Sequence, residues 1–216
     1  MEVVQLKNHI SRRTEKIQFI VIHDTGNDSP KAGATAHKKY FLTTERKASA
    51  DFVVENDTII KLNDYYKYFT WHCGDGKGRF GITNSNSIGI EMCINPEANR
   101  QKTINTTIKL VYDLMEELKI RHTRIVRHYD ASRKKCPGSM ASNNWSEWWS
   151  FKDSLREYRA ERKDKGTYIV VEYNNDKALI ETINKNDYNY VKIRDIAKLL
   201  GKEVSYTKDQ VTLQDK

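Results

Sequence analysis

The sequence predicts an α/β fold in which a central mixed β-sheet is flanked by helices and followed by a small C-terminal α+β domain. Short apolar, β-branched runs alternate along the chain with segments whose apolar residues recur at helical spacing. After residue 167 the pattern changes to short β-rich runs with one short helix. We therefore expect a first domain at residues 1–158, a charged linker at 159–167 and a small β-rich domain at 168–216.

Five runs in the first domain have the character of strands. Residues 17–22 are short, continuously apolar and β-branched, as expected for a buried strand. Residues 51–54 and 58–62 lie on either side of a hairpin turn signal. Residues 87–94 alternate with period two, and residues 124–127 form a last short run. If the first and last of these strands are parallel, their carboxyl ends share one edge of the sheet, where open α/β sheets place their sites.

Three segments of the same domain predict helices, at residues 34–42, 103–119 and 145–163. In the second helix, one apolar stripe contains Ile104, Ile108, Val111, Tyr112, Met115 and Leu118. The alternation in residues 87–94 predicts one strand face with Ile88, Ile90, Met92 and Ile94 and another with Gly89, Glu91 and Cys93. The sequence after residue 167 predicts one more helix around residues 194–200.

Charge, apolar content and cysteine spacing restrict the kinds of partner and the compartment that this protein can have. The net charge is +8, and its excess lies before Thr167, because eight Lys or Arg and eight Asp or Glu follow. This charge favours a polyanion, either nucleic acid or an anionic surface such as a bacterial wall, with plain solubility as the alternative. No run of 18 apolar residues predicts a membrane span. Three irregularly spaced cysteines do not form a disulfide framework, which fits a reducing compartment.

The first residues lack the apolar segment of a secretory signal. We therefore expect synthesis in the cytoplasm, and any action outside the cell requires another route of release.

The segment RHYDASRKKCPG at residues 127–138 is the strongest candidate for chemistry. It places His128 and Cys136 around a basic loop, and imidazole and thiolate are ligands that zinc prefers. The best third ligand is His23, which follows an apolar run as His128 does. Each residue alone is more often structural. Together they predict a zinc site with an open position for water, whose pKa the metal lowers to about 7.

Four further residues are candidates around that site. Glu91 is a carboxylate in an apolar strand, which favours a general base, with a salt bridge or an edge position as the alternative. Lys134 could stabilise an oxyanion, although composition alone favours a solvated basic loop. Trp71 and His72, in a Gly-rich loop, are predicted to line the substrate cleft, and a stacked structural histidine is the alternative.

Five segments, in this order, carry a family resemblance: FIVIHDTGN at 19–27, KASADF at 47–52, WHCGDG at 71–76, NSIGIEMCIN at 86–95 and VRHYDASRKKCPG at 126–138. With them the chain resembles the zinc-dependent N-acetylmuramoyl-L-alanine amidases of the second type. That family includes phage endolysins, bacterial autolysins and the animal peptidoglycan recognition proteins. The resemblance covers roughly residues 15–145.

The resemblance implies zinc held by His23, His128 and Cys136. It implies hydrolysis of the amide between N-acetylmuramic acid and the L-alanine of the stem peptide of peptidoglycan. Glu91 matches the glutamate proposed as base in the bacterial and phage members, and Lys134 matches a catalytic lysine of other phage members. Where some members have an active-site tyrosine this chain has Ala50, which leaves that role either absent or filled by Glu91.

The tail from about Tyr168 resembles the small domain named after the N-termini of copper amine oxidases. The resemblance implies attachment to the wall, including its anionic polymers, or self-association into an oligomer. It does not imply copper, because the tail has no pair of His or Cys to bind it.

Several functions compete at this stage. A phage endolysin is the leading hypothesis, and a host autolysin or spore-wall amidase has the same chemistry. A peptidoglycan-binding module without catalysis is the alternative of another class, which the presence of Cys136 disfavours. Nucleic-acid binding is the weakest hypothesis, because aromatic residues are not interleaved with the Lys and Arg clusters.

Overall fold

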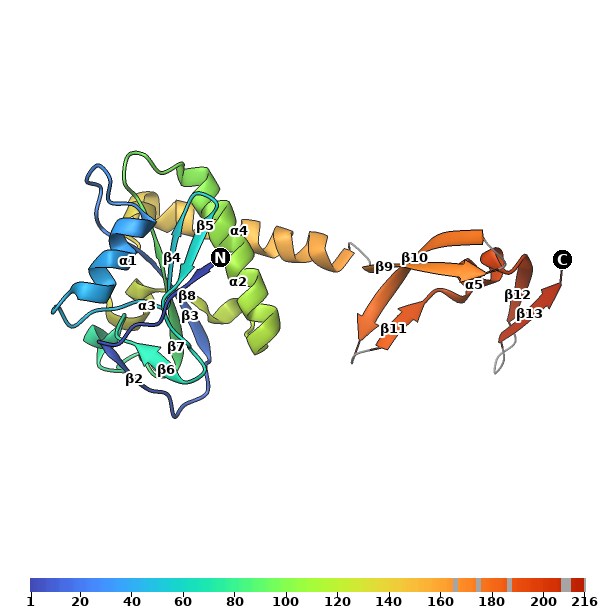
Figure 1. Ribbon diagram of the computed structural model, residues 1–216, viewed down its shortest axis with the longest axis horizontal. Coiled ribbons are helices and arrows are strands. Elements are labelled where there is room, and N and C mark those ends of the chain that lie inside the picture. The colour runs from blue at the N-terminus through green and yellow to red at the C-terminus, as the bar shows by residue number, and fades with distance from the viewer. Residues whose placement is uncertain (165–166, 174–175, 186–187, 207–210, 216) are drawn as a thin grey trace. The chain divides into compact units, whose positions relative to one another are not determined.

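The computed structural model shows two compact units, Met1–Tyr158 and Arg159–Lys216 (Figure 1). The residues that it describes are 1–164, 167–173, 176–185, 188–206 and 211–215. Residues 159–164 of the predicted linker are helical, and residues 165 and 166 of that linker lie outside the described part.

A six-stranded sheet forms the centre of the first unit, in the order β1-β5-β4-β7-β3-β8. Its strands are β1 (Glu2–Val3), β3 (Phe19–Asp24), β4 (Phe52–Glu55), β5 (Thr58–Lys61), β7 (Ser87–Met92) and β8 (Ile125–Arg127). Strand β3 is parallel to both β7 and β8, and β4 is parallel to β7 but antiparallel to β5. The predicted mixed sheet is thus confirmed, as is the parallel pairing of the first and last predicted strands.

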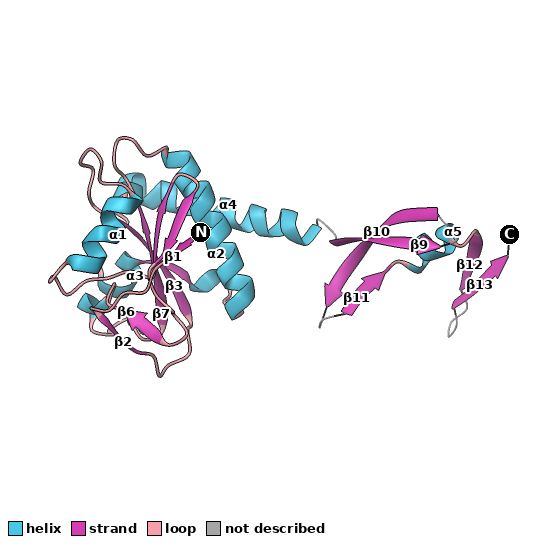
Figure 2. Cartoon of the chain, viewed as in Figure 1, coloured by secondary structure: helices cyan, strands magenta, loops and turns pink. Residues whose placement is uncertain are grey.

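Helices cover both faces of this sheet (Figure 2). Helices α2 (Arg100–Leu118) and α4 (Ser142–Asp164) pack on one face, which carries the larger apolar core. Helix α1 (Ala34–Thr43) packs with a smaller apolar cluster on the other. The apolar stripe predicted for α2 faces the core: four of its members are buried and Tyr112 and Leu118 are partly buried against them.

The predicted alternation is confirmed within β7, which ends at Met92, so that Ile94 lies beyond the strand and outside the core. Ile88, Ile90 and Met92 belong to the larger core, whereas Cys93, just after the strand, belongs to the smaller cluster on the opposite face. Both faces are buried, so the strands in the middle of the sheet exclude water from two sides.

Several boundaries differ from the sequence-based expectation. Strand β3 continues to Asp24, because β7 continues beside it and pairs His23 with Glu91 and Asp24 with Met92. His128 begins a short helix, α3 (His128–Ser132), where we expected a basic loop. Three short strands, whose residues are mainly exposed or half-buried, were not predicted: β1, β2 (Ile10–Arg12) and β6 (Tyr68–Thr70).

In its described residues after the end of α4, the second unit contains small antiparallel sheets and the helix α5 (Ile193–Leu199). Strands β9 (Thr167–Tyr173), β10 (Asp176–Lys185) and β11 (Tyr188–Val191) form one sheet in the order β11-β10-β9. Strands β12 (Lys202–Tyr206) and β13 (Val211–Asp215) form another. The predicted helix is α5 (Ile193–Leu199). Among the described residues, no helix combines the length and the apolar character needed to cross a bilayer.

The contribution of the larger apolar core to stability can be tested at Ile90 on β7. Ile90 is 0% exposed at the centre of the sheet. We expect Ile90→Ala to lower the free energy of unfolding by about 2–5 kcal/mol, because it removes buried methylenes and leaves a cavity. Urea denaturation measures this loss, with Val3→Ala on the exposed edge as control. A loss below about 1 kcal/mol would contradict the core described here.

Candidate active site

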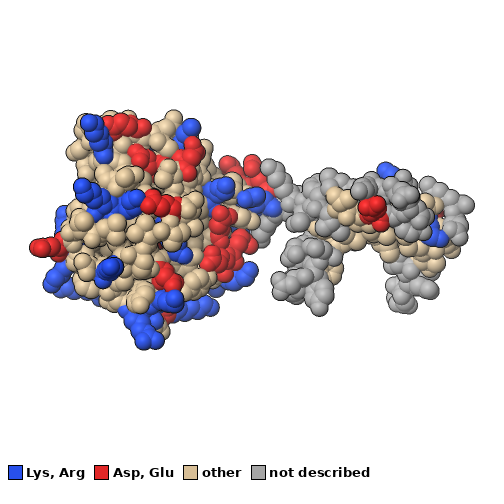
Figure 3. Space-filling view, in the orientation of Figure 1, with Lys and Arg blue, Asp and Glu red and all other residues tan. Residues whose placement is uncertain are grey.

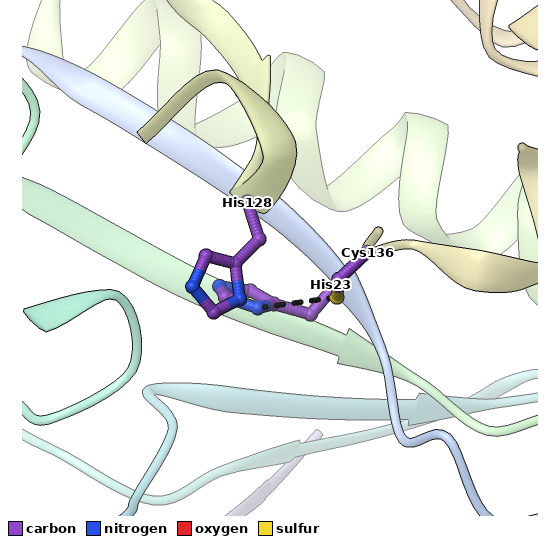
Figure 4. Close-up of side chains that lie close together, drawn as sticks. All are labelled: His23, His128 and Cys136. Carbon is purple, nitrogen blue, oxygen red and sulfur yellow. Dashed lines mark hydrogen bonds between the residues drawn. The ribbon is translucent and has the colours of Figure 1, made fainter. Parts of the chain in front are cut away.

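The three residues predicted as metal ligands converge at one end of the sheet (Figure 4). His23 lies on β3, His128 is the first residue of α3, and Cys136 lies in the loop after α3. One ligand atom from each lies within 4.8 Å of the other two. All three side chains are buried, with exposed fractions of 2%, 3% and 6%. Within the described residues, no other group of His, Cys, Asp or Glu has this arrangement.

Strand pairing explains this convergence. Ile22 on β3 pairs with Arg127 on β8, so that the next residues, His23 and His128, leave neighbouring parallel strands side by side. Their ring centroids are 4.6 Å apart. The loop after α3 then returns to its start, where the Tyr129 backbone N–H donates to the Cys136 carbonyl at 2.9 Å.

Each imidazole uses one ring nitrogen for a protein partner and keeps the other for the centre. His128 Nε2 lies 2.7 Å from Asp75 Oδ1, and His23 Nε2 lies 3.0 Å from His72 Nδ1. His128 Nδ1 is buried without a hydrogen-bond partner, and His23 Nδ1 lies 3.7 Å from Cys136 Sγ. Two inward-facing imidazole nitrogens and one sulfur, with partners on the outer nitrogens, are a donor set that fits zinc.

Burial keeps these groups neutral when no cation is bound. It lowers the pKa of His23 well below the usual value, and His72, His128 and Lys134 add to the effect. Burial also lowers the pKa of His128, against the opposing pull of Asp75. It raises the pKa of the Cys136 thiol, and the nearby Glu91 carboxylate raises it further. A thiolate at this position therefore requires a positive charge such as a metal ion.

Glu91 faces the same centre from β7. It pairs with His23 in the sheet, and its Oε1 lies 3.9 Å from His23 Nδ1. Its Oε2 is buried without a hydrogen-bond partner. Burial and the neighbouring Asp24 carboxylate raise the pKa of Glu91 to about 8, although Lys134 opposes them. A carboxyl group with one free oxygen and a raised pKa can accept and return a proton near neutral pH.

A groove of about 700 Å³ opens beside these residues. Lys134, Trp71 and His72 all line it. Lys134 is exposed, whereas Trp71 is half-buried and its indole N–H donates to Ser11 Oγ at 3.0 Å. His72 is 9% exposed, and its ring nitrogens lie near His23 and Ser87. Contact of Trp71 and His72 with substrate stays a prediction.

Two aspartates that support the site were not predicted. Asp75 lies beside His128 because the backbone at Gly76 comes very close to the Ala131 carbonyl. A Cβ atom on residue 76 would collide with that carbonyl oxygen, so glycine is needed there. Asp51 is 0% exposed and accepts hydrogen bonds from the Gly89 backbone and from two side chains. A lone aspartate next to an apolar run gives little sequence signal, and only the Gly-rich context of Asp75 indicated an unusual backbone.

A family model described as N-acetylmuramoyl-L-alanine amidase matches residues 13–139. The chain belongs to this amidase family. The matched segment contains His23, Glu91, His128 and Cys136, together with the strands and helices from β3 to α3 that position them.

Characterised relatives agree with this membership. The chain is 31% identical over 137 residues to the N-acetylmuramoyl-L-alanine amidase CwlH of Bacillus subtilis (strain 168), which covers 63% of this chain and 52% of the relative. It is 32% identical over 140 residues to the amidase XlyA of the same organism, covering 63% of this chain and 43% of the relative. The chain thus spans about half the length of the curated relatives it matches.

Solved structures show the same fold. A mutant endolysin from Bacillus subtilis is 30% identical with a TM-score of 0.63, and covers 72% of this chain and 99% of that chain. The catalytic domain of XlyA is 29% identical with a TM-score of 0.61 and the same coverage. The amidase family has the mixed α/β fold found here.

Asp51 joins three buried segments near the site, and its contribution to stability can be tested. Its carboxylate accepts from the Asn63 amide, the Thr70 hydroxyl and the Gly89 backbone at 2.7–2.8 Å. We expect Asp51→Ala to lower the free energy of unfolding by about 3 kcal/mol or more, because several buried donors lose their acceptor. Chemical denaturation measures the loss, and Asp57→Ala in the exposed hairpin turn is the control. Equal stabilities of the two variants would show that the hydrogen bonds accepted by Asp51 do not stabilise the fold.

Proposed function

We propose that this chain is a zinc-dependent peptidoglycan hydrolase that cleaves the amide between N-acetylmuramic acid and the L-alanine of the stem peptide. The observation that carries the proposal is the buried convergence of His23, His128 and Cys136 within 4.8 Å, beside an open groove. Membership of the N-acetylmuramoyl-L-alanine amidase family supports the reaction. The names of the relatives CwlH and XlyA support the same bond.

His23, His128 and Cys136 would hold the metal. Three protein ligands leave a fourth position for water, as in catalytic rather than structural zinc sites. When bound, zinc supplies a Lewis acid that makes water a nucleophile near neutral pH.

Glu91 is proposed as the general base and acid. Its free Oε2 takes a proton from the attacking water and returns it to the nitrogen of the leaving L-alanine. Burial raises the pKa of Glu91, whereas the positive charge of a bound metal would favour the carboxylate form that accepts the first proton. Ala50 is 0% exposed within the smaller apolar cluster and offers no phenol, so the proton path depends on Glu91.

Lys134 is proposed to stabilise the negative oxygen that forms when water adds to the amide carbonyl. Its ammonium lines the groove and lies close enough to the centre to act on the pKa values of His23 and Glu91. A positive charge held at the edge of a buried site stabilises an oxyanion more strongly than it would in water.

The charge of the groove suits an acidic substrate. Its lining cations are Lys31, Arg46, Lys134 and Lys135, and its lining carboxylates are Asp24 and Glu91. Lys and Arg side chains are also spread over the visible surface of the first unit (Figure 3). Stem peptides carry carboxylates, and wall polymers are anionic, so both are attracted to such a surface.

Among amidases, an endolysin is the favoured biological role, with a host autolysin or spore-wall enzyme as the alternative. A relative with an endolysin fold and 30% identity supports the first. A binding module without catalysis is disfavoured because Cys136 is present beside both histidines. In this proposal the enzyme acts on the bacterial cell wall after release from the cytoplasm, without binding nucleic acid.

The domain assignment is also a proposal: residues 1–158 carry catalysis, 159–167 connect, and 168–216 form a small domain that attaches the enzyme to the wall or lets it self-associate. The resemblance of the tail to the domain named after copper amine oxidases supports that role.

Metal content tests the ligand set. We expect the purified full chain to hold about one zinc ion per molecule and His128→Ala to lose it, because two protein ligands no longer enclose the ion. His9→Ala is the matched control, since His9 bonds to the Thr44 carbonyl outside the centre. Elemental analysis after dialysis gives the answer, and full zinc retention by His128→Ala would refute the ligand set.

Glu91→Gln tests the proposed base. We expect wall hydrolysis to fall by at least about 100-fold, because the amide cannot take a proton from water. Zinc content should be unchanged, since Gln replaces Glu without removing a metal ligand. Release of new L-alanine amino termini from purified peptidoglycan is the measurement. Activity within about threefold of the parent would exclude Glu91 as the base.

Lys134→Ala tests the proposed oxyanion contact. We expect kcat to fall by roughly 10–1000-fold with a smaller change in KM, because the charge acts on the transition state. Lys77→Ala, outside the groove, is the control. A rise in KM at constant kcat would instead assign Lys134 to substrate binding.

A further inference from the structure

A chain of buried polar groups leads away from the metal centre behind His23. His23 Nε2 lies 3.0 Å from His72 Nδ1, and His72 Nε2 lies 3.0 Å from Ser87 Oγ. The Ser87 hydroxyl in turn donates to the Thr83 carbonyl. His23, His72 and Ser87 are 2%, 9% and 0% exposed, so bulk water cannot replace any of these partners.

The last bond of this chain determines the direction of all the others. A carbonyl oxygen only accepts, so the single hydroxyl proton of Ser87 lies toward Thr83. Ser87 Oγ then has only lone pairs for His72, whose Nε2 must carry the proton that joins them. A neutral His72 with its proton on Nε2 presents a bare Nδ1 to His23.

The same reasoning continues into the centre. The bare Nδ1 of His72 accepts, so His23 Nε2 carries a proton and donates it. The neutral His23 ring then has its lone pair on Nδ1, the atom that lies 3.7 Å from Cys136 Sγ. The reverse order would place a proton on Nδ1 and block coordination. For His128, the Asp75 carboxylate fixes the tautomer directly. A carboxylate only accepts, so His128 Nε2 carries the proton and Nδ1 keeps its lone pair.

The His72 ring packs against β7 at Gly89, where there is no side chain in its way. A Cβ atom on Gly89 would lie 2.6 Å from His72 Cγ and 2.8 Å from its Nδ1. Glycine is therefore required here by space. Gly89 leaves no open space on this face of the strand, because the His72 ring covers it. This contact is independent of the hydrogen bonds and holds the ring in the same position.

We propose that His72 and Ser87 are positioning residues that fix His23 in the tautomer whose Nδ1 lone pair faces the metal. The proposal rests on the zinc site of the proposed function and adds two residues to it. His72 thereby gains a role behind the ligand, where the sequence had indicated contact with substrate.

Zinc affinity of the full chain, measured by competition with a chromogenic chelator, tests this role. Ser87→Ala is expected to weaken binding about tenfold or more, because His72 can then adopt either tautomer. Cys73→Ala is the matched control. Its sulfur lies 3.7 Å from Ser87 Oγ and 4.0 Å from His72 Nε2, but a thiol can either donate or accept and so does not fix the proton of His72. The control should bind within about twofold of the parent.

A second pair of variants separates acceptor chemistry from packing. His72→Asn keeps an acceptor oxygen where Nδ1 lies and is expected to bind zinc within a few-fold of the parent. His72→Leu fills the space without an acceptor and is expected to lose about 10–100-fold. Equal affinities of these two variants, or of Ser87→Ala and the parent, would overturn the proposal.

The parent protein offers a measurement that does not depend on any variant folding. A long-range ¹H–¹⁵N correlation spectrum of the zinc-loaded chain reports which nitrogen of each imidazole carries the proton. We expect Nε2–H for both His23 and His72, and Nδ1–H for His72 would overturn the proposal. If the parent bound no zinc, the proposed function would fail as well, whereas zinc binding with the wrong tautomer would refute only this inference.

Discussion

Parallel pairing of β3 with both of its neighbours is the constraint on which the candidate site depends. Because β3 lies between β7 and β8, His23 is beside Glu91 on one side and beside His128 on the other. Two proposed ligands and the proposed base thus come from adjacent strands at one edge of the sheet. Only Cys136 requires a connecting segment, and the short helix α3 with the loop after it brings its sulfur to His23.

This arrangement requires polar groups in a part of the molecule that excludes water. Both faces of the central strands are covered, and the ligands themselves are 2–6% exposed. Burial of polar groups is costly unless each has a partner. Here the outer nitrogens of the histidines have partners in Asp75 and His72. Two of the buried atoms left without one, His128 Nδ1 and Glu91 Oε2, belong to residues at the centre, where a metal and water would satisfy them.

Sequence patterns predicted the parts of this structure that depend on periodicity. The sheet, the helix α2 with its apolar stripe and the placement of two histidines at neighbouring strand ends all follow from apolar spacing. The patterns did not predict β1, β2 or β6, which are two or three residues long and, unlike the equally short β8, consist mainly of exposed or half-buried residues. Nor could they predict α3, whose single turn is stabilised by contacts with β8, β3 and the Gly74–Gly76 segment.

The ligands were predicted from residue type, but their partners were not. Asp75 and Ser87 have common residue types and no characteristic spacing from the histidines. Their roles depend on close approaches of the backbone at Gly76 and of the His72 ring at Gly89, which only three-dimensional packing reveals. The small size of Gly89 makes room for the His72 ring.

The central claim is that two imidazoles and one sulfur share a single ion. Zinc K-edge X-ray absorption of the purified full chain tests it most directly. The account predicts one sulfur at about 2.3 Å together with nitrogen and oxygen ligands at about 2.0–2.1 Å. A first shell without sulfur, or with several sulfurs, would contradict it.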